Sequence, residues 1–96
     1  MDKKQIKQLK AIAHKLKPIV TVGQHGMKDS INDELEIALD FHQLIKLKVN
    51  IGDRDARDQL IEELCAKHKA ELVQRIGNIA VIYRNNPEKE NMLKKF

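Results

Sequence analysis

Apolar residues recur at the spacing of an α-helix in three stretches of this sequence. In residues 2–16 they fall within about 120° of arc at 100° per residue, on Ile6, Leu9, Ile12, Ala13 and Leu16. In the second stretch they are Met27, Ile31, Leu35 and Ala38, and His42 continues the same spacing to residue 42, where the stretch ends. In residues 54–68, with Asp53 or Asp55 as the N-cap, they are Ala56, Leu60, Ile61, Leu64 and Cys65. The pattern predicts three amphipathic helices, each with one face in the core.

The clearest strand pattern covers residues 44–51. Apolar residues alternate strictly with Lys46, Lys48 and Asn50, and a period of two sends alternate side chains to opposite faces of a sheet. We therefore expect the apolar set to face the core and both lysines to lie on the other side. Part of one sheet face is then open to solvent.

Three further strands complete a predicted α/β fold. Residues 19–22 form a short apolar run, and residues 70–76 and 79–84 flank Gly77-Asn78, a signal for a two-residue hairpin turn. The element order α-β-α-β-α-β-β predicts a single domain with three helices and a four-stranded mixed sheet. We expect the two strand–helix–strand units to pair in parallel through right-handed crossovers, and the hairpin to add an antiparallel strand.

Length and composition limit what the chain can be. Its 96 residues suffice for one domain with a modest core. We expect that core at about residues 2–86, followed by a polar tail at 87–96 that could hold one short helix. No stretch has the length of a membrane span or the pattern of a signal peptide. The single cysteine, Cys65, rules out an internal disulfide, and a reduced, cytoplasmic setting is the simplest interpretation.

Basic residues gather at the two ends of the chain. The net charge is +4 overall, but residues 1–17 alone carry six Lys and one Asp, which gives +5. On the first helix the basic side chains line a stripe beside the apolar one; they are Lys3, Lys7, Lys10 and His14, and Lys17 continues the stripe by position. Like charges at this spacing repel one another, and Asp2 is the only acid of the helix, so the stripe favours a polyanionic partner. The alternative is a merely solvated helix face.

A loop with two glycines separates the first strand from the second helix. Residues 22–28 read Val-Gly-Gln-His-Gly-Met-Lys, so Gly23 and Gly26 bracket Gln24 and His25. Glycines allow the backbone to approach a phosphate closely, and the free N–H groups at the start of the helix would point at that phosphate. Lys28 would neutralise its charge. An ordinary strand-to-helix turn is the alternative, since glycine is common in turns.

No group of side chains points to catalysis, to a metal or to a cofactor. Only His68 among the four histidines has a cysteine, Cys65, at helical spacing, and two ligands do not make a zinc site. Cys65 has no clear activating cation and is interpreted as a core residue, while His42 and His68 are expected to be partly buried helix-end residues. The three aromatic residues are too few for a sheet that stacks bases, so nucleic acid would be held by its backbone and shape.

Five segments between residues 16 and 84 form a recognisable set, and the resemblance they carry covers about residues 4–86. They are Leu16-Lys17-Pro18, Val22-Gly23-Gln24-His25-Gly26, Leu44-Ile45-Lys46-Leu47-Lys48-Val49, Ile76-Gly77-Asn78 and Val81-Ile82-Tyr83-Arg84. Together they resemble the CRM domain, in particular its stand-alone bacterial YhbY-type form. The resemblance implies RNA binding and an α/β fold similar to the C-terminal domain of bacterial translation initiation factor three. It also implies an association of the stand-alone form with precursors of the large ribosomal subunit, and of plant relatives with group II intron splicing.

The same resemblance implies particular binding residues. The Gly-x-x-Gly loop of the family carries over to Gly23 and Gly26. The basic residue inside or just after that loop is supplied by His25 and Lys28, and Arg84 matches at the end of the last strand.

These observations combine into one prediction, a non-catalytic, monomeric RNA-binding protein that acts in ribosome assembly on precursor large-subunit ribosomal RNA. Its predicted RNA contacts are the loop residues Gly23, Gln24, His25 and Gly26, together with Lys28, Lys3, Lys7, Lys10, Lys17, Lys46, Lys48 and Arg84. The prediction requires that the loop and the lysines form one continuous cationic groove. No metal, cofactor, membrane or small-molecule substrate is expected.

Two other classes of function stay open at this point. The second helix is acidic outside its apolar stripe, at Asp29, Asp33, Glu34, Glu36 and Asp40. A protein-binding adaptor on ribosomal particles could dock a basic ribosomal protein through these acids. A small RNA-processing enzyme with His25 as its base is the third option, but the sequence shows no partner residue for it.

Overall fold

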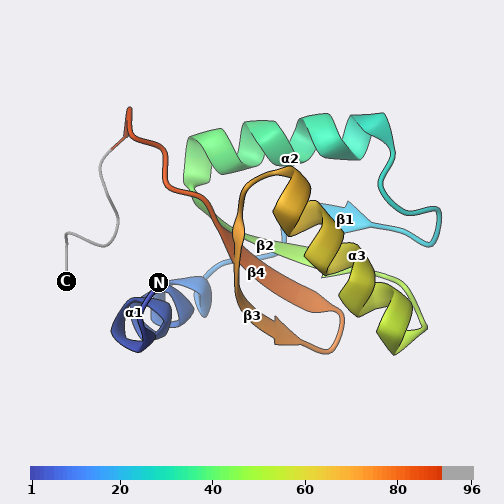
Figure 1. Cartoon of the computed structure of the whole chain (residues 1–96), viewed down its shortest axis with the longest axis horizontal. Helices are drawn as coiled ribbons and strands as arrows, with labels where there is room; N and C mark the ends of the chain where they lie inside the picture. The colour runs from blue at the N-terminus through green and yellow to red at the C-terminus, as the bar shows by residue number, and fades with distance from the viewer. Residues whose placement is uncertain (90–96) are drawn as a thin grey trace.

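Seven elements follow one another in the order predicted from the sequence (Figure 1). The computed structural model describes residues 1–89, and its elements are α1 (Lys3–Ala13), β1 (Val20–Val22), α2 (Asp29–His42), β2 (Leu44–Val49), α3 (Arg54–Lys67), β3 (Glu71–Ile76) and β4 (Ile79–Tyr83). The expected α/β class, with three helices and a four-stranded mixed sheet, is confirmed. In the described part of the chain, no helix is long and apolar enough to cross a membrane. The short helix considered for the tail, in the run 88–95, falls mostly on residues that lie outside the described part of the chain.

The strands lie side by side in the order β1-β2-β4-β3. β1 pairs with β2 in parallel, as expected for the first strand–helix–strand unit. The expected parallel pairing of β2 with β3 is wrong, because β4 lies between them and pairs antiparallel with both. β4 is buried along most of its length, whereas much of β3 is exposed. The central place therefore goes to the strand with more apolar surface to bury, and the edge to the more polar one.

Helices cover both faces of the sheet, which gives two cores. α2 and α3 pack on the face that presents Ile45, Leu47 and Val49 of β2. α1 packs on the other face, where Leu9 and Ala13 form a smaller core with residues of β2, β3 and β4. Because the two cores lie on opposite sides of one sheet, every second residue of β2 points toward α1.

Helix α1 covers only part of its face of the sheet, and the part left open carries Lys46 and Lys48. Lys46 lies opposite Val81 and Lys48 opposite Ile79, so both side chains share the face on which α1 packs. Lys48 is exposed and Lys46 is half-buried. The prediction of a partly open sheet face with both lysines on it is confirmed.

Local capping sets the helix ends. Asp2 and Gln5 form a reciprocal capping box at the start of α1, in which the Gln5 N–H donates to Asp2 Oδ1 at 2.8 Å. α1 ends at Ala13, short of the predicted residue 16. Asp53, rather than Asp55, caps α3 by accepting a hydrogen bond from the Ala56 N–H at 3.3 Å.

Two residues differ from expectation: Ala56 was expected on the core side and His42 partly buried, and both are exposed. Ala56 lies in the first turn of α3, outside either core, and the core contacts of this helix begin only at Leu60. His42 ends α2 and is exposed, with its ring edge-on to Phe41 at a centroid distance of 4.8 Å. His68, just after α3, is more buried than expected, with 3% exposure.

Candidate nucleic-acid interface

The glycine-flanked loop is a closed turn. The Gly26 N–H donates to the Gly23 carbonyl at 3.0 Å, so this amide is already paired and a phosphate at the loop would need other donors. Gly26 has φ +77°, a left-handed conformation that favours glycine. Gly23 has no positive φ and open space at its Cβ position. Gln24 and His25 are exposed at the tip of the turn.

The start of α2 follows directly behind this loop. Lys28 is the N-cap residue, and its side chain makes no capping hydrogen bond. The Lys28 carbonyl accepts the first helical hydrogen bond, from the Asn32 N–H at 3.0 Å, so the N–H groups of residues 29–31 have no partner within the helix. These N–H groups and the helix dipole favour an anion. Asp29, in the first turn, places one carboxylate near this position, where it would oppose a phosphate.

Among the lysines predicted to contact RNA, Lys48 is placed beside the glycine loop by the sheet register. It pairs with Thr21 across β1 and β2, and Thr21 lies two residues before Gly23. Lys46 lies two residues earlier on the same face of β2, about 7 Å away along the strand. The pattern of β2 predicted the shared face of the two lysines, and the sheet register adds their position next to the loop.

Lys46 in turn lies close to Lys17. The two residues line one hollow of about 140 Å³ at the junction of α1 and β1, together with His42 and the apolar residues Leu16, Ile19, Leu44 and Ile45. The backbone holds this junction, because the Ile19 N–H donates to the Lys46 carbonyl at 3.0 Å. The lysines at positions 17, 46 and 48 thus follow one another from the end of α1 to the glycine loop.

The stripe on α1 is farther from the loop than the sequence suggests. Lys3, Lys7 and Lys10 are exposed, as predicted. However, α1 and the loop lie at opposite ends of the longest dimension of the molecule, which measures 38 Å (Figure 1). The strands between them, β1, β2 and β4, contain no Asp or Glu. Lys17, Lys46 and Lys48 lie between the stripe and the loop.

Arg57 lies near the loop but was not among the RNA contacts predicted from the sequence. Arg57 of α3 lines a hollow of about 300 Å³ together with Gln24, Asn50 and Asn78, as well as Ile51 and Gly52. Its guanidinium donates one hydrogen bond, to the Ile51 carbonyl at 3.2 Å, and its buried Nε has no partner among the described residues. Arg54 and Arg57 in the first turn of α3 were a signal that could have drawn attention to this helix end.

Arg84, by contrast, is engaged within the protein. Its guanidinium donates to Glu36 Oε2 at 2.9 Å, to Asp40 Oδ1 at 2.8 Å and to the His68 carbonyl at 2.9 Å. These bonds tie the end of β4 to α2 and to the end of α3. A role of Arg84 in RNA binding stays a prediction, but these two carboxylates already take up its charge.

The same cluster contains the buried histidine. His68 contacts the Glu36 carboxylate through Nδ1 and Asn32 Oδ1 through Nε2, the second at 2.8 Å. The hydrogen bonds from Arg84 and then from His68 hold the pKa of the Glu36 carboxyl below its usual 4.5. Glu36 is therefore the shared acceptor of the cluster, and two acids of α2 have an internal structural role.

Metal binding and thiol chemistry find no support in the described residues. Residues 1–89 contain no group of three or more His, Cys, Asp or Glu side chains placed to hold a metal ion. Cys65 is half-buried against the larger core, and burial raises the pKa of its thiol to about 11. Its interpretation as a core residue agrees with this environment.

We expect the Cys65 thiol of the folded protein to be almost unreactive at pH 8. A thiol with a pKa of about 11 is overwhelmingly protonated at that pH, and only the thiolate is nucleophilic. Alkylation with iodoacetamide, followed by mass spectrometry, should be at least about tenfold slower than in urea. Equal rates in the folded and unfolded chain would contradict this burial.

Comparisons with known proteins assign a family to this chain. The model of the CRS1 / YhbY (CRM) domain family matches residues 1–84. A Pseudomonas aeruginosa protein named probable RNA-binding protein PA4753 is 44% identical over 92% of this chain and 85% of its own length. A Haemophilus influenzae protein named RNA-binding protein is 40% identical over 92% of this chain and 89% of its own. The names describe RNA binding and no catalysis, in agreement with the expectation that the chain is not an enzyme.

A solved structure supports the fold as well. It is the solution structure of a hypothetical protein from Staphylococcus aureus, described as a candidate RNA-binding protein. The two chains superimpose with a TM-score of 0.80 at 34% identity, covering 95% of this chain and 93% of the other. The element arrangement described above is therefore shared with an experimentally determined relative.

Proposed function

Since this chain belongs to the CRS1/YhbY (CRM) domain family, we propose that it is an RNA-binding protein that acts in ribosome assembly, on precursor large-subunit ribosomal RNA. The names of its relatives support RNA as the ligand. The ribosomal substrate rests on the resemblance to the stand-alone bacterial form of the CRM domain. We further propose that it acts as a monomer in the cytoplasm.

The observation that carries this proposal is the line of lysines along the open sheet face. Lys17, Lys46 and Lys48 lead from α1 to the glycine loop, and the strands beneath them carry no acid within β1, β2 or β4. A ribose-phosphate strand laid along this line would meet three ammonium groups in turn and no carboxylate from those strands. Such a surface suits a polyanion held by its backbone.

At the loop end we propose one tightly held phosphate. We propose that the N–H groups of residues 29–31 and the side chains of Gln24, His25 and Lys28 hold it. Arg57 shares a neighbouring hollow with Gln24. The Gly26 amide is excluded from this set by its bond to Gly23. Asp29 limits the affinity of the site, because its carboxylate lies in the same helical turn.

Aromatic side chains support recognition of backbone rather than of bases. Tyr83 is buried in the smaller core, and Phe41 is exposed on α2, on the opposite side of the sheet from the lysine line. Neither the phenylalanine nor the tyrosine within residues 1–89 is therefore available to stack a base on the open sheet face. Modest sequence preference and strong dependence on salt follow.

The salt dependence gives a quantitative test. If about five phosphates of single-stranded RNA are neutralised, the logarithm of the affinity should fall with the logarithm of the salt concentration at a slope of roughly −3.5. Fluorescence anisotropy with a labelled single-stranded RNA at several KCl concentrations measures this slope. A slope near zero would contradict binding through phosphates.

Charge reversal measures separately how much the β2 lysines and the α1 lysines contribute to the salt dependence of RNA binding. The double variant Lys46→Glu/Lys48→Glu should lower the magnitude of the slope by about 1.4, the contribution of two phosphates. The matched double variant Lys7→Glu/Lys10→Glu tests the α1 stripe in the same way. If the stripe variant retains the slope of the unaltered protein, the α1 lysines are only solvated and the RNA path ends at Lys17.

A further inference from the structure

Two large apolar side chains lie exposed on α2. Ile37 is 70% exposed and Phe41 is 65% exposed, although Leu35 and Leu39 of the same helix are fully buried against the sheet. Ile37 and Phe41 are one helical turn apart, on the side of α2 turned away from the sheet. A helix with buried apolar residues on one side and exposed ones on the other has one face still without a partner.

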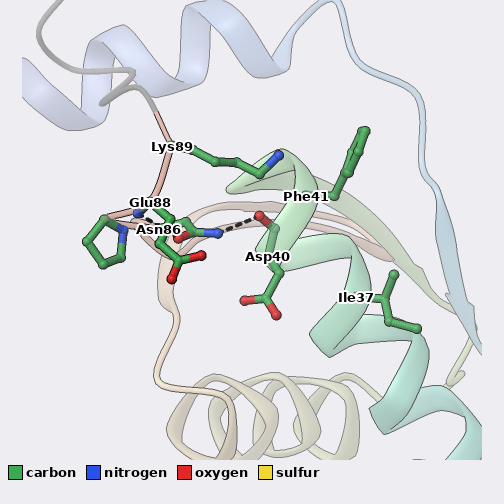
Figure 2. Close-up of a pocket in the computed structure, with 7 residues that line it drawn as sticks. Ile37, Asp40, Phe41, Asn86, Glu88 and Lys89 are labelled. Atoms are coloured by element: carbon green, nitrogen blue, oxygen red, sulfur yellow. Dashed lines mark hydrogen bonds between the residues drawn. The ribbon is translucent and has the colours of Figure 1, made fainter.

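A hollow of about 570 Å³ adjoins this pair, between α2 and the segment that follows β4. It is lined by Ile37, Asp40, Phe41, Asn86, Pro87, Glu88 and Lys89 (Figure 2). Asn86 fixes the segment, because its Nδ2 donates to the Asp40 carbonyl at 2.8 Å. The Lys89 ammonium lies 4.4 Å from the centre of the Phe41 ring, and Figure 2 shows its side chain extended toward that ring. Phe41 thus already accepts a cation over its face.

Carboxylates surround the apolar pair. Asp33 and Glu34 lie one turn before Ile37 on the same side of α2 and are exposed, without a hydrogen bond or ion pair to the rest of residues 1–89. Glu88 is exposed across the hollow. Lys89 is the one basic residue that lines the hollow within the described chain. The surface therefore combines apolar contact area with negative charge, the opposite of the lysine line on the far side of the sheet.

We propose that this surface, the Ile37/Phe41 face, docks a basic segment of another protein that carries apolar side chains among its lysines and arginines. The apolar side chains of such a segment would enter the hollow beside Ile37 and Phe41. Its cations would pair with Asp33 and Glu34, and one could lie over Phe41 as Lys89 does. This chemistry is that of the cationic extensions of proteins that themselves bind nucleic acid.

Other occupants fit this face less well. RNA is disfavoured because its phosphates would meet the carboxylates of Asp33, Glu34 and Glu88. A second copy of this chain, packed α2 against α2, would bring these acids against one another. The Ile37/Phe41 face and the lysine line lie on opposite sides of the sheet, so a protein and an RNA can be bound at the same time. The proposal does not depend on the proposed RNA function.

A defined peptide tests the proposal. The probe is a fluorescein-labelled synthetic peptide of leucine, lysine and arginine with its leucines at helical spacing, titrated with the full chain in an anisotropy assay. We expect binding that the double variant Ile37→Ser/Phe41→Ser weakens at least about tenfold, and that Asp33→Asn/Glu34→Gln weakens about threefold at low salt. A peptide with serine in place of leucine should bind at least about tenfold more weakly to the unaltered chain.

The matched control removes exposed apolar residues from a different element. Leu72→Ser/Ile76→Ser alters two exposed residues of β3 and should leave peptide binding unchanged. Three results would overturn the proposal: equal loss in both serine variants, self-association in sedimentation that only Ile37→Ser/Phe41→Ser abolishes, or binding of labelled RNA that this variant abolishes. At least about tenfold tighter peptide binding by a chain ending at Lys89 would likewise overturn it, because residues 90–96 would then compete for the face.

Discussion

Replacement of Gln24 and His25 together by aspartate should weaken RNA binding by at least about 30-fold, because like charges brought together at an interface cost several kcal/mol. Both side chains are exposed at the tip of the turn, so the change adds two carboxylates beside the proposed phosphate without touching either core. The anisotropy assay with single-stranded RNA measures the affinity. Thermal unfolding measures whether the fold is intact, and we expect its midpoint to change little.

The neutral double variant Gln24→Asn/His25→Gln is the control for this experiment. It changes the same two positions without adding charge, so its affinity should lie within about threefold of the original. If the folded aspartate variant binds RNA as tightly as the unaltered chain, the loop does not contact the RNA. The lysine line would then have to account for binding alone.

Alanine substitutions at the two glycines separate an effect on RNA contact from an effect on backbone conformation. Gly26→Ala places a side chain at φ +77°, which costs about 1–2 kcal/mol of folding free energy. Gly23→Ala meets open space at an ordinary φ and should fold normally. Loss of RNA affinity in Gly23→Ala without loss of stability would indicate close approach of the ligand at that position. Apart from its two chain neighbours, no residue in the described part of the chain has an atom within 4 Å of the added Cβ.

The periodicity of the chain predicted the elements but not all of their neighbours. Each helix and strand has an apolar pattern of its own, so local sequence identifies it. The place of β4 between β2 and β3 depends instead on which strand buries more surface in the finished sheet, a property of the whole fold. Ala56 illustrates the same limit, because helical spacing placed it on the core side although the contacts of α3 start one turn later.

The arrangement of the candidate site was predictable to the extent that its residues are close in sequence. The loop and Lys28 are contiguous, and the period of β2 was enough to put Lys46 and Lys48 on one face. Packing between distant segments places Lys17 and Lys46 at one hollow, and Arg57 and Gln24 at another. Arg84 shows the converse, because its carboxylate partners Glu36 and Asp40 lie more than forty residues earlier, and no local pattern reveals such a partner.

Arg84→Gln should lower the free energy of unfolding by about 1–2 kcal/mol while leaving the RNA affinity nearly unchanged. The substitution removes the hydrogen bonds from the guanidinium to Glu36, Asp40 and the His68 carbonyl. Hydrogen bonds of charged groups are the stronger ones, but both carboxylates are half-exposed or more, and solvent screening reduces their contribution. Urea unfolding measures the stability. A folded Arg84→Gln protein with unchanged stability and tenfold weaker RNA binding would instead assign Arg84 to the RNA contacts.

The dependence of the free energy of unfolding on pH, measured at acid pH, tests the contacts of Glu36 with Arg84 and His68 independently. Hydrogen bonds from Arg84 and His68 lower the pKa of Glu36 in the folded protein, so the unfolded chain takes up this proton first as the pH falls. The stabilisation by Glu36 is therefore fully present above about pH 4.5 and is lost as the pH falls through the lowered pKa. In Glu36→Gln this part of the acid destabilisation should be absent. In Arg84→Gln it should be smaller, because the hydrogen bond that lowers the pKa of Glu36 most is gone. The unaltered chain, Glu36→Gln and Arg84→Gln could instead lose stability identically as the pH falls. Protonation of Glu36 would then not be coupled to folding, and the bonds that join α2, α3 and β4 would contribute to geometry rather than to stability.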